Sequence, residues 1–135
     1  MAGKAFLDTN VLLTLLSADA AKAGRAEELV GGGGVISIQV LNEFASAASR
    51  KLRLSIPEIR ECLEPIARIC RIEPLTLQTH ARGLEVAARY GFSVYDSMIV
   101  AAALLSGCDT LYSEDLQHQQ RVDGLLIRNP FRTGR

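Results

Sequence analysis

An apolar stretch near the start of the chain, ending in three polar residues, restricts the possible folds most. Residues 5–7 form a short apolar run that we interpret as a buried strand, and Asp8, Thr9 and Asn10 follow at once. Apolar side chains then recur at helical spacing over residues 11–16. In an open α/β sheet, ligands bind outside the carboxyl ends of the strands, where this polar cluster would lie. Asp8 or Asn10 can equally serve as the N-cap of the following helix.

Short apolar runs alternate with longer amphipathic stretches along the whole chain. We expect strands near residues 5–7, 35–38, 72–75, 108–113 and 125–127, and a turn at 122–124. Helices are expected near 10–17, 20–30, 39–53, 55–70, 77–90 and 93–106. Strands that alternate with helices predict an α/β fold with a parallel sheet, in one domain spanning residues 1–135.

Composition excludes a strong global attraction to nucleic acid. Lys and Arg together number 15, as do Asp and Glu, so the net charge is zero. RNA binding would therefore need local patches or metal ions. No apolar run reaches the length of a membrane span. The three cysteines do not pair at disulfide or zinc-ligand spacing, so we expect reduced thiols in a cytoplasmic protein.

Acidic side chains recur at equivalent places in the predicted sheet. Asp8 follows the first strand, Glu43 lies in the first turns of the helix after the second, and Asp115 follows a late strand. Asp96 lies in the first turn of a helix that is apolar all round and therefore buried. Asp109 begins the late strand, so we expect it at the opposite edge of the sheet from Asp115, roughly 20 Å from that residue.

Each acid also has a purely structural explanation. Asp96 can complete a capping box with Ser93, and Glu43 suits the positive end of a helix dipole. The alternative functions fit less well. Gly31 to Gly34 lie between a helix and a strand, the reverse of a phosphate-binding loop, and no dinucleotide-binding glycine pattern follows the first strand. A phosphoacceptor receiver domain would need a late Lys, and none follows Lys51.

Four short segments resemble the acidic motifs of a known nuclease family. They are Phe-Leu-Asp-Thr-Asn at 6–10, Ser-Ile-Gln-Val-Leu-Asn-Glu-Phe at 37–44, Tyr-Asp-Ser-Met-Ile at 95–99 and Tyr-Ser-Glu-Asp-Leu at 112–116. In this order and at these separations the chain resembles PIN-domain nucleases, most of all the small VapC-type toxins of toxin–antitoxin pairs. The resemblance covers essentially the whole chain.

This resemblance implies a three-layer α/β/α PIN-like fold with a central parallel sheet of four to five strands. It implies an endoribonuclease that depends on Mg²⁺ or Mn²⁺, acts on RNA, forms a homodimer and is inhibited by a small antitoxin protein. The metal-binding and catalytic residues would be Asp8, Glu43, Asp96 and Asp115, with Thr9 and Asn10 as supporting polar groups. Glu114 offers a second carboxylate beside Asp115, and the family spacing favours Asp115.

Carboxylates suit this chemistry because Mg²⁺ and Mn²⁺ prefer hard oxygen ligands. A bound ion activates a water and stabilises charge on the attacked phosphate. It also bridges the carboxylates of the protein to the RNA phosphate, which would let a chain of zero net charge bind a polyanion. The alternative is a catalytically inactive PIN-like scaffold that binds RNA or a protein partner.

Overall fold

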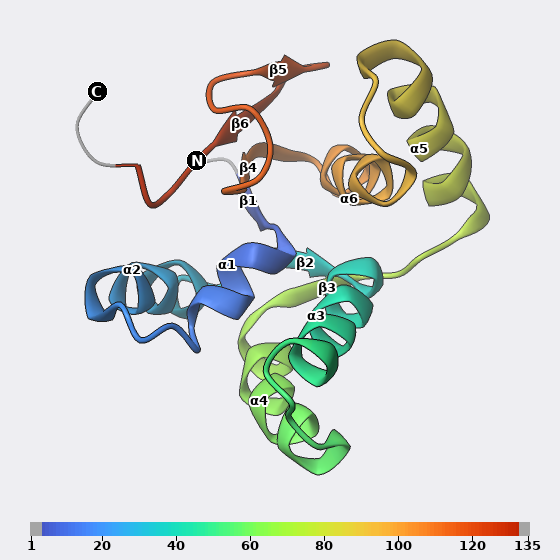
Figure 1. The fold of residues 1–135 in the computed structure, drawn as a ribbon. Helices are drawn as coiled ribbons and strands as arrows, with labels where there is room; N and C mark the ends of the chain where they lie inside the picture. Colours follow the sequence, from blue (N-terminus) through green and yellow to red (C-terminus); the bar gives the residue numbers. More distant parts are fainter. Residues whose placement is uncertain (1–3, 133–135) are drawn as a thin grey trace.

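Helices and strands alternate along the chain in the computed structural model, which describes residues 4–132 (Figure 1). The strands are β1 (Lys4–Leu7), β2 (Val35–Ser37), β3 (Arg71–Glu73), β4 (Cys108–Tyr112), β5 (Arg121–Val122) and β6 (Leu125–Arg128). The helices are α1 (Thr9–Thr14), α2 (Ala20–Gly31), α3 (Ile38–Arg50), α4 (Ile56–Ile69), α5 (Leu77–Tyr90) and α6 (Val94–Leu105).

One sheet runs through the centre of the molecule in the order β3-β2-β1-β4-β6-β5. All neighbours are parallel except β5 and β6, which pair antiparallel. In Figure 1, α5 and α6 lie on one side of the sheet, and α1 and α2 lie on the other. The predicted α/β fold with a mostly parallel sheet is therefore confirmed.

The sheet has six strands, whereas we expected four to five. The additional strand, β5, is two residues long, and its second residue, Val122, falls in the segment predicted to be only a turn. Asp123 and Gly124 do form that turn, with φ angles of 48° and 88°, and Val122 pairs with Leu125 across it. Two central residues with positive φ match the right-handed twist of a hairpin.

Local capping signals fix the starts of three helices, those at Ser55 and Ser93 as predicted and that at Ser37 within a segment predicted as strand. The hydroxyls of Ser37, Ser55 and Ser93 each accept a hydrogen bond from a backbone N–H in the first turn of α3, α4 and α6. Gly91 ends α5 in the left-handed conformation, with φ 78°, which costs glycine little because it has no Cβ. Helix α1 is shorter than expected, because residues 15–17 continue it only as tighter turns with i to i−3 hydrogen bonds.

The core lies between the sheet and the flanking helices. Helix α6 is buried along residues 97–103, as its apolar sequence predicts, and it packs on α5, β4 and β2. Cys70 and Cys108 are buried, Cys62 is half-buried, and none of the three forms a disulfide within the described residues. No helix within residues 4–132 is both long and apolar enough to cross a membrane.

Replacement of Ser93 by Ala tests the cap of α6. The Ser93 hydroxyl accepts a hydrogen bond from the Asp96 N–H at 3.1 Å, and its loss leaves that donor without an intrahelical partner. We expect the free energy of unfolding to fall by about 1 kcal/mol in urea denaturation. An unchanged midpoint would show that the cap contributes nothing to stability.

Candidate active site

The carboxyl ends of β1, β4 and β6 lie side by side at one edge of the sheet. Leu7 pairs with Tyr112, and Tyr112 pairs with Arg128. One residue further, the Asp8 N–H donates to the Tyr112 carbonyl at 3.0 Å and the Ser113 N–H donates to the Arg128 carbonyl at 2.9 Å. The residues that follow β1 and β4 are therefore level with each other.

Asp8 is the most buried acid of this edge, with 3% of its surface exposed. Its Oδ1 accepts a hydrogen bond from the Thr9 N–H at 2.7 Å, so Asp8 is the N-cap of α1, as one interpretation of the sequence held. Its Oδ2 accepts from the Ser113 hydroxyl at 2.8 Å and from Asn10 Nδ2 at 3.2 Å. The cap thus uses one oxygen, and the other faces the segment after β4.

Asn10 joins the end of β1 to that segment. Its Nδ2 lies 3.2 Å from Asp8 Oδ2 and 3.2 Å from Asp115 Oδ2, so one amide group donates to two carboxylates. Its Oδ1 accepts from the Glu114 N–H at 3.0 Å. Asn10 therefore places the carboxylate of Asp115 next to that of Asp8.

Glu43 approaches the same edge from α3, which begins directly after β2. Its Oε1 accepts from the Thr9 hydroxyl at 3.3 Å, and its Oε2 accepts from Gln39 Nε2 at 2.8 Å. The bond to Thr9 links Glu43 to the residue that follows Asp8. The bond to Gln39, one helical turn earlier, restricts the rotamers of the glutamate side chain.

Asp96 lies in the first turn of α6 and is half-buried. Its backbone N–H bonds to Ser93, yet within residues 4–132 its carboxylate has no hydrogen-bond or ion-pair partner. In the complete capping box of α4, by contrast, Glu58 Oε1 accepts from the Ser55 N–H at 2.8 Å. Asp96 thus fills the N3 position of a cap without using its carboxylate there.

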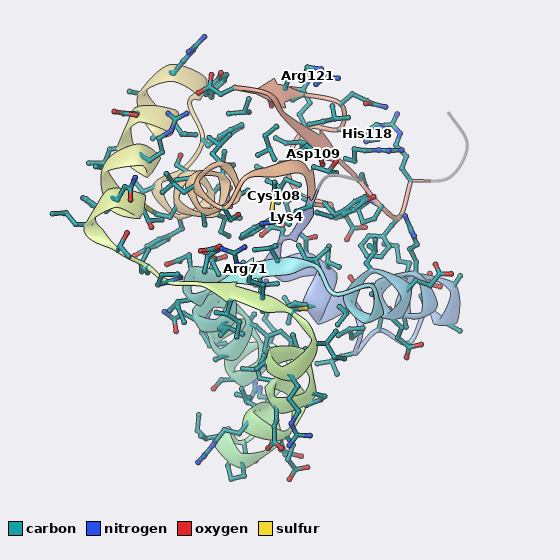
Figure 2. The ribbon with its side chains drawn as sticks, turned by 180° about the vertical axis from the view of Figure 1, so that it is seen from behind. Lys4, Arg71, Cys108, Asp109, His118 and Arg121 are labelled. Atoms are coloured by element: carbon teal, nitrogen blue, oxygen red, sulfur yellow. The ribbon has the colours of Figure 1, made fainter. Side chains whose placement is uncertain are left out.

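The two adjacent acids after β4 have different partners. Glu114 Oε2 lies 2.7 Å from the ammonium group of Lys22 in α2, whereas Asp115 bonds to Asn10. Asp109 is exposed at the start of β4, one residue from Cys108, which pairs with Lys4 of β1. Figure 2, seen from behind, shows Asp109 beside Lys4 and Cys108 at that far end of the strands, as expected.

Burial raises the pKa of Asp8 from its usual 3.8 to about 6. Loss of hydration is the largest cause, and the negative charges of Asp96 and Glu43 add to it. The hydrogen bonds from Ser113 and from the Thr9 N–H act in the opposite direction. Glu43 and Asp96 therefore lie close enough to Asp8 for their negative charges to act on it.

Within residues 4–132, neither Asp8 nor Glu43, Asp96 or Asp115 forms an ion pair with Lys, Arg or His. A buried carboxylate without a cation is costly, and a divalent ion is the partner that hard oxygen donors fit. Across the same residues, no three acidic, His or Cys side chains lie close enough together to hold one ion by themselves. This still fits Mg²⁺, which binds through one or two carboxylates and keeps several waters.

Two residues of this edge were not singled out by the sequence. Ser113 is fully buried, and its hydroxyl donates to Asp8 while accepting from the N–H groups of Asp115 and Leu116 at 3.2 Å. Gln39 precedes Glu43 by four positions on α3. A polar residue at a strand end beside two acids, and a Gln one turn before an acid, are the signals that could have identified them.

The raised pKa of Asp8 makes the stability of the metal-free protein depend on pH. Because the folded state binds the Asp8 proton more tightly than the unfolded chain, stability from this group falls as pH rises from about 4 to about 6. The free energy of unfolding lost in this way is on the order of 3 kcal/mol. Urea denaturation in EDTA measures this contribution as the difference in free energy of unfolding between the wild type and Asp8→Asn, because the variant has no carboxyl group at this position to bind the proton. A difference that stays constant over this range would contradict it.

Comparison with known proteins was made by sequence and by structure. Residues 5–125 match the family model described as the PIN domain. No curated protein sequence matches the chain. The VapC20 toxin of Mycobacterium tuberculosis, which cleaves the sarcin–ricin loop, is similar in structure with a TM-score of 0.66 at 21% identity, over 83% of this chain and 90% of that one.

Two toxin–antitoxin complexes contain similar chains. One from Klebsiella pneumoniae has a TM-score of 0.71 at 18% identity, over 95% of this chain and 98% of that one. The DNA-bound VapBC complex of Salmonella typhimurium has a TM-score of 0.71 at 20% identity, over 96% and 99%. At these identities the structural likeness supports the fold alone, whereas the family model covers nearly the whole chain. On that match, the chain belongs to the PIN-domain family.

Proposed function

We propose that this protein is an endoribonuclease that hydrolyses RNA phosphodiester bonds with Mg²⁺ or Mn²⁺. The observation that carries the proposal is the Asp8 carboxylate, which is 3% exposed, adjoins other carboxylates and has no cationic side chain as partner within residues 4–132. A buried negative charge of this kind costs stability without a ligand. Membership of a nuclease family supports the same assignment.

Asp8, Glu43, Asp96 and Asp115 would hold the metal, one or two of them directly and the others through its bound waters, and Thr9 and Asn10 would support them. Asn10 keeps the carboxylates of Asp8 and Asp115 together, while Thr9 and Gln39 fix that of Glu43. Such supporting hydrogen bonds orient metal ligands and raise affinity. A bound divalent ion would supply Lewis-acid chemistry, activating a water and stabilising negative charge on the phosphate.

A catalytically inactive PIN-like scaffold that binds RNA or a protein partner is the alternative function. One observation favours it: within the described part of the chain, no three acidic side chains converge on a single point. The two functions differ in one outcome, since only the enzyme cleaves RNA when a divalent metal is added.

We also propose that the protein acts as a cytoplasmic toxin, as a homodimer that a small antitoxin inhibits. Toxin–antitoxin complexes among the similar structures support this partner. A groove of about 430 Å³ between α1, α2, α3 and α4 supplies a place for it. Apolar side chains line this groove, including those of Leu16, Val30, Phe44, Ile66 and Ile69. An apolar segment of the antitoxin would pack against this lining.

Removal of the Asp8 charge tests the enzymatic proposal. We expect Asp8→Asn and Asp96→Asn each to lower the rate of RNA cleavage in Mg²⁺ by at least about a hundredfold. EDTA abolishes cleavage by the wild type. Asp109→Asn is the matched control, because Asp109 is exposed at the other end of β4, and it keeps wild-type activity. Cleavage of transfer and ribosomal RNA, followed on gels, measures the activity of the wild type and of the three variants.

Cleavage by Asp8→Asn at the wild-type rate would refute the metal-site assignment. Equal loss of activity in Asp109→Asn would show that the assay reports stability instead of chemistry. Absence of cleavage by the wild type in both metals would favour the scaffold.

A charge in the apolar groove tests the antitoxin proposal. Ile69 is 48% exposed and lines the groove, so Ile69→Glu leaves the core intact and places a charge on the docking surface. We expect this variant not to co-purify with the product of a small reading frame beside its gene. Leu77→Glu on α5, where Leu77 is 82% exposed, is the control and retains the partner. Retention by Ile69→Glu would place the partner elsewhere.

A further inference from the structure

A hollow with several cationic side chains lies beside the carboxylate cluster. It measures about 350 Å³ and is lined by residues of α2 and of the segment after β6, among them Lys22, Arg25, Phe131 and Arg132. Asp19 is the acidic side chain of its lining, and its Oδ1 is engaged in capping α2 through the N–H groups of Ala21 and Lys22. Three cationic side chains thus gather in this lining, and two of them form ion pairs with acids outside it: Lys22 with Glu114 and Arg25 with Glu28.

Lys22 connects this hollow to the carboxylates. Its Nζ lies 2.7 Å from Glu114 Oε2, and Glu114 is the residue before Asp115. The Nζ also lies 5.5 Å from the centre of the Phe131 ring, which is a cation–π distance. Lys22 is thus held at the border between the hollow and the proposed metal site, with 41% of its side chain exposed.

Arg25 is fixed one turn further along α2. Its Nε donates to the Pro130 carbonyl at 3.2 Å, its guanidinium carbon lies 6.0 Å from the Tyr112 ring centre, and its Nη1 lies 3.5 Å from Glu28 Oε1. These contacts join α2 to the chain after β6 and hold the walls of the hollow together. Arg25 therefore has a fixed place in the wall of the hollow.

We propose that this hollow binds the phosphate backbone of the RNA strand next to the cleavage site, and that Lys22 is its principal phosphate contact. In the free protein Lys22 is paired with Glu114, and when RNA binds, a phosphate replaces Glu114 as the partner of Lys22. The inference rests on the proposed ribonuclease function. The position of Lys22 carries it, since this cation lies in the lining of the hollow, is paired with the residue before Asp115, and can attract a phosphate next to carboxylates that repel RNA.

This exchange of partners predicts that substitutions of Lys22 and Glu114 change the RNA affinity in opposite directions. Lys22→Gln removes a phosphate contact, so it weakens RNA binding roughly threefold, by a similar factor for different sequences, and lowers the salt slope by about 0.7. Glu114→Gln frees Lys22 and tightens RNA binding. If the pair only held the segment after β4 in place, both variants would weaken binding or neither would change it.

Fluorescence anisotropy with a labelled single-stranded RNA, in EDTA and at several KCl concentrations, measures these effects. Arg60→Gln is the matched control: Arg60 is exposed on α4, has no ion pair within the described residues, and is expected to bind as wild type does. Thermal melting checks that each variant folds. Steady-state cleavage in Mg²⁺ adds a second readout, in which Lys22→Gln raises KM and leaves kcat unchanged.

The inference would be overturned if Lys22→Gln bound RNA with the affinity and salt slope of the wild type. It would also be overturned if Glu114→Gln weakened RNA binding as Lys22→Gln does. The two proposals fail separately. If the wild type cleaves RNA and Lys22→Gln binds normally, the ribonuclease assignment stands and the phosphate subsite does not. If binding depends on Lys22 and no metal supports cleavage, the RNA surface stands and the enzymatic function does not.

Discussion

Only 3% of the surface of Asp8 is exposed, so water no longer stabilises the charge of its carboxylate. Among residues 4–132, its hydrogen-bond partners are all neutral donors: the Thr9 N–H, the Ser113 hydroxyl and the Asn10 amide. Asp96 and Glu43 add repulsion, so the pKa of Asp8 rises to about 6. Lys22, which reaches the segment after β4, is paired with Glu114. A divalent ion is the ligand that would relieve this arrangement, which is why we assign a metal-dependent function to this edge.

Most of the fold could be predicted because its signals are local. Ser55 and Glu58 mark the start of α4 as a capping box, and Gly91 marks the end of α5 by a backbone conformation that glycine adopts readily. The parts that were missed depend on distant partners or on few residues. Strand β5 is two residues long and exists through its pairing with β6. Helix α1 changes to tighter turns after Thr14, although its apolar spacing continues.

The candidate site could be predicted only in outline. Parallel strands predicted that Asp8 and Asp115 share an edge, and their shared hydrogen bonds to Asn10 agree with this. Sequence could not decide whether Asp96 uses its carboxylate in a cap, because the answer depends on the rotamer and on the nearby charge of Asp8. Nor could it reveal that Glu114 is neutralised by Lys22, a residue 92 positions earlier in the chain. These are tertiary contacts with no local pattern.

Calorimetric titration of Mn²⁺ at a pH of about 6, in buffers that differ in ionisation enthalpy, tests the central claim most directly. At this pH a large part of Asp8 is protonated, and a metal that binds its carboxylate must displace that proton. The account predicts that the wild type binds Mn²⁺ with measurable proton release and that Asp8→Asn loses both. Equal Mn²⁺ binding by Asp8→Asn, or binding by the wild type without proton release, would contradict it.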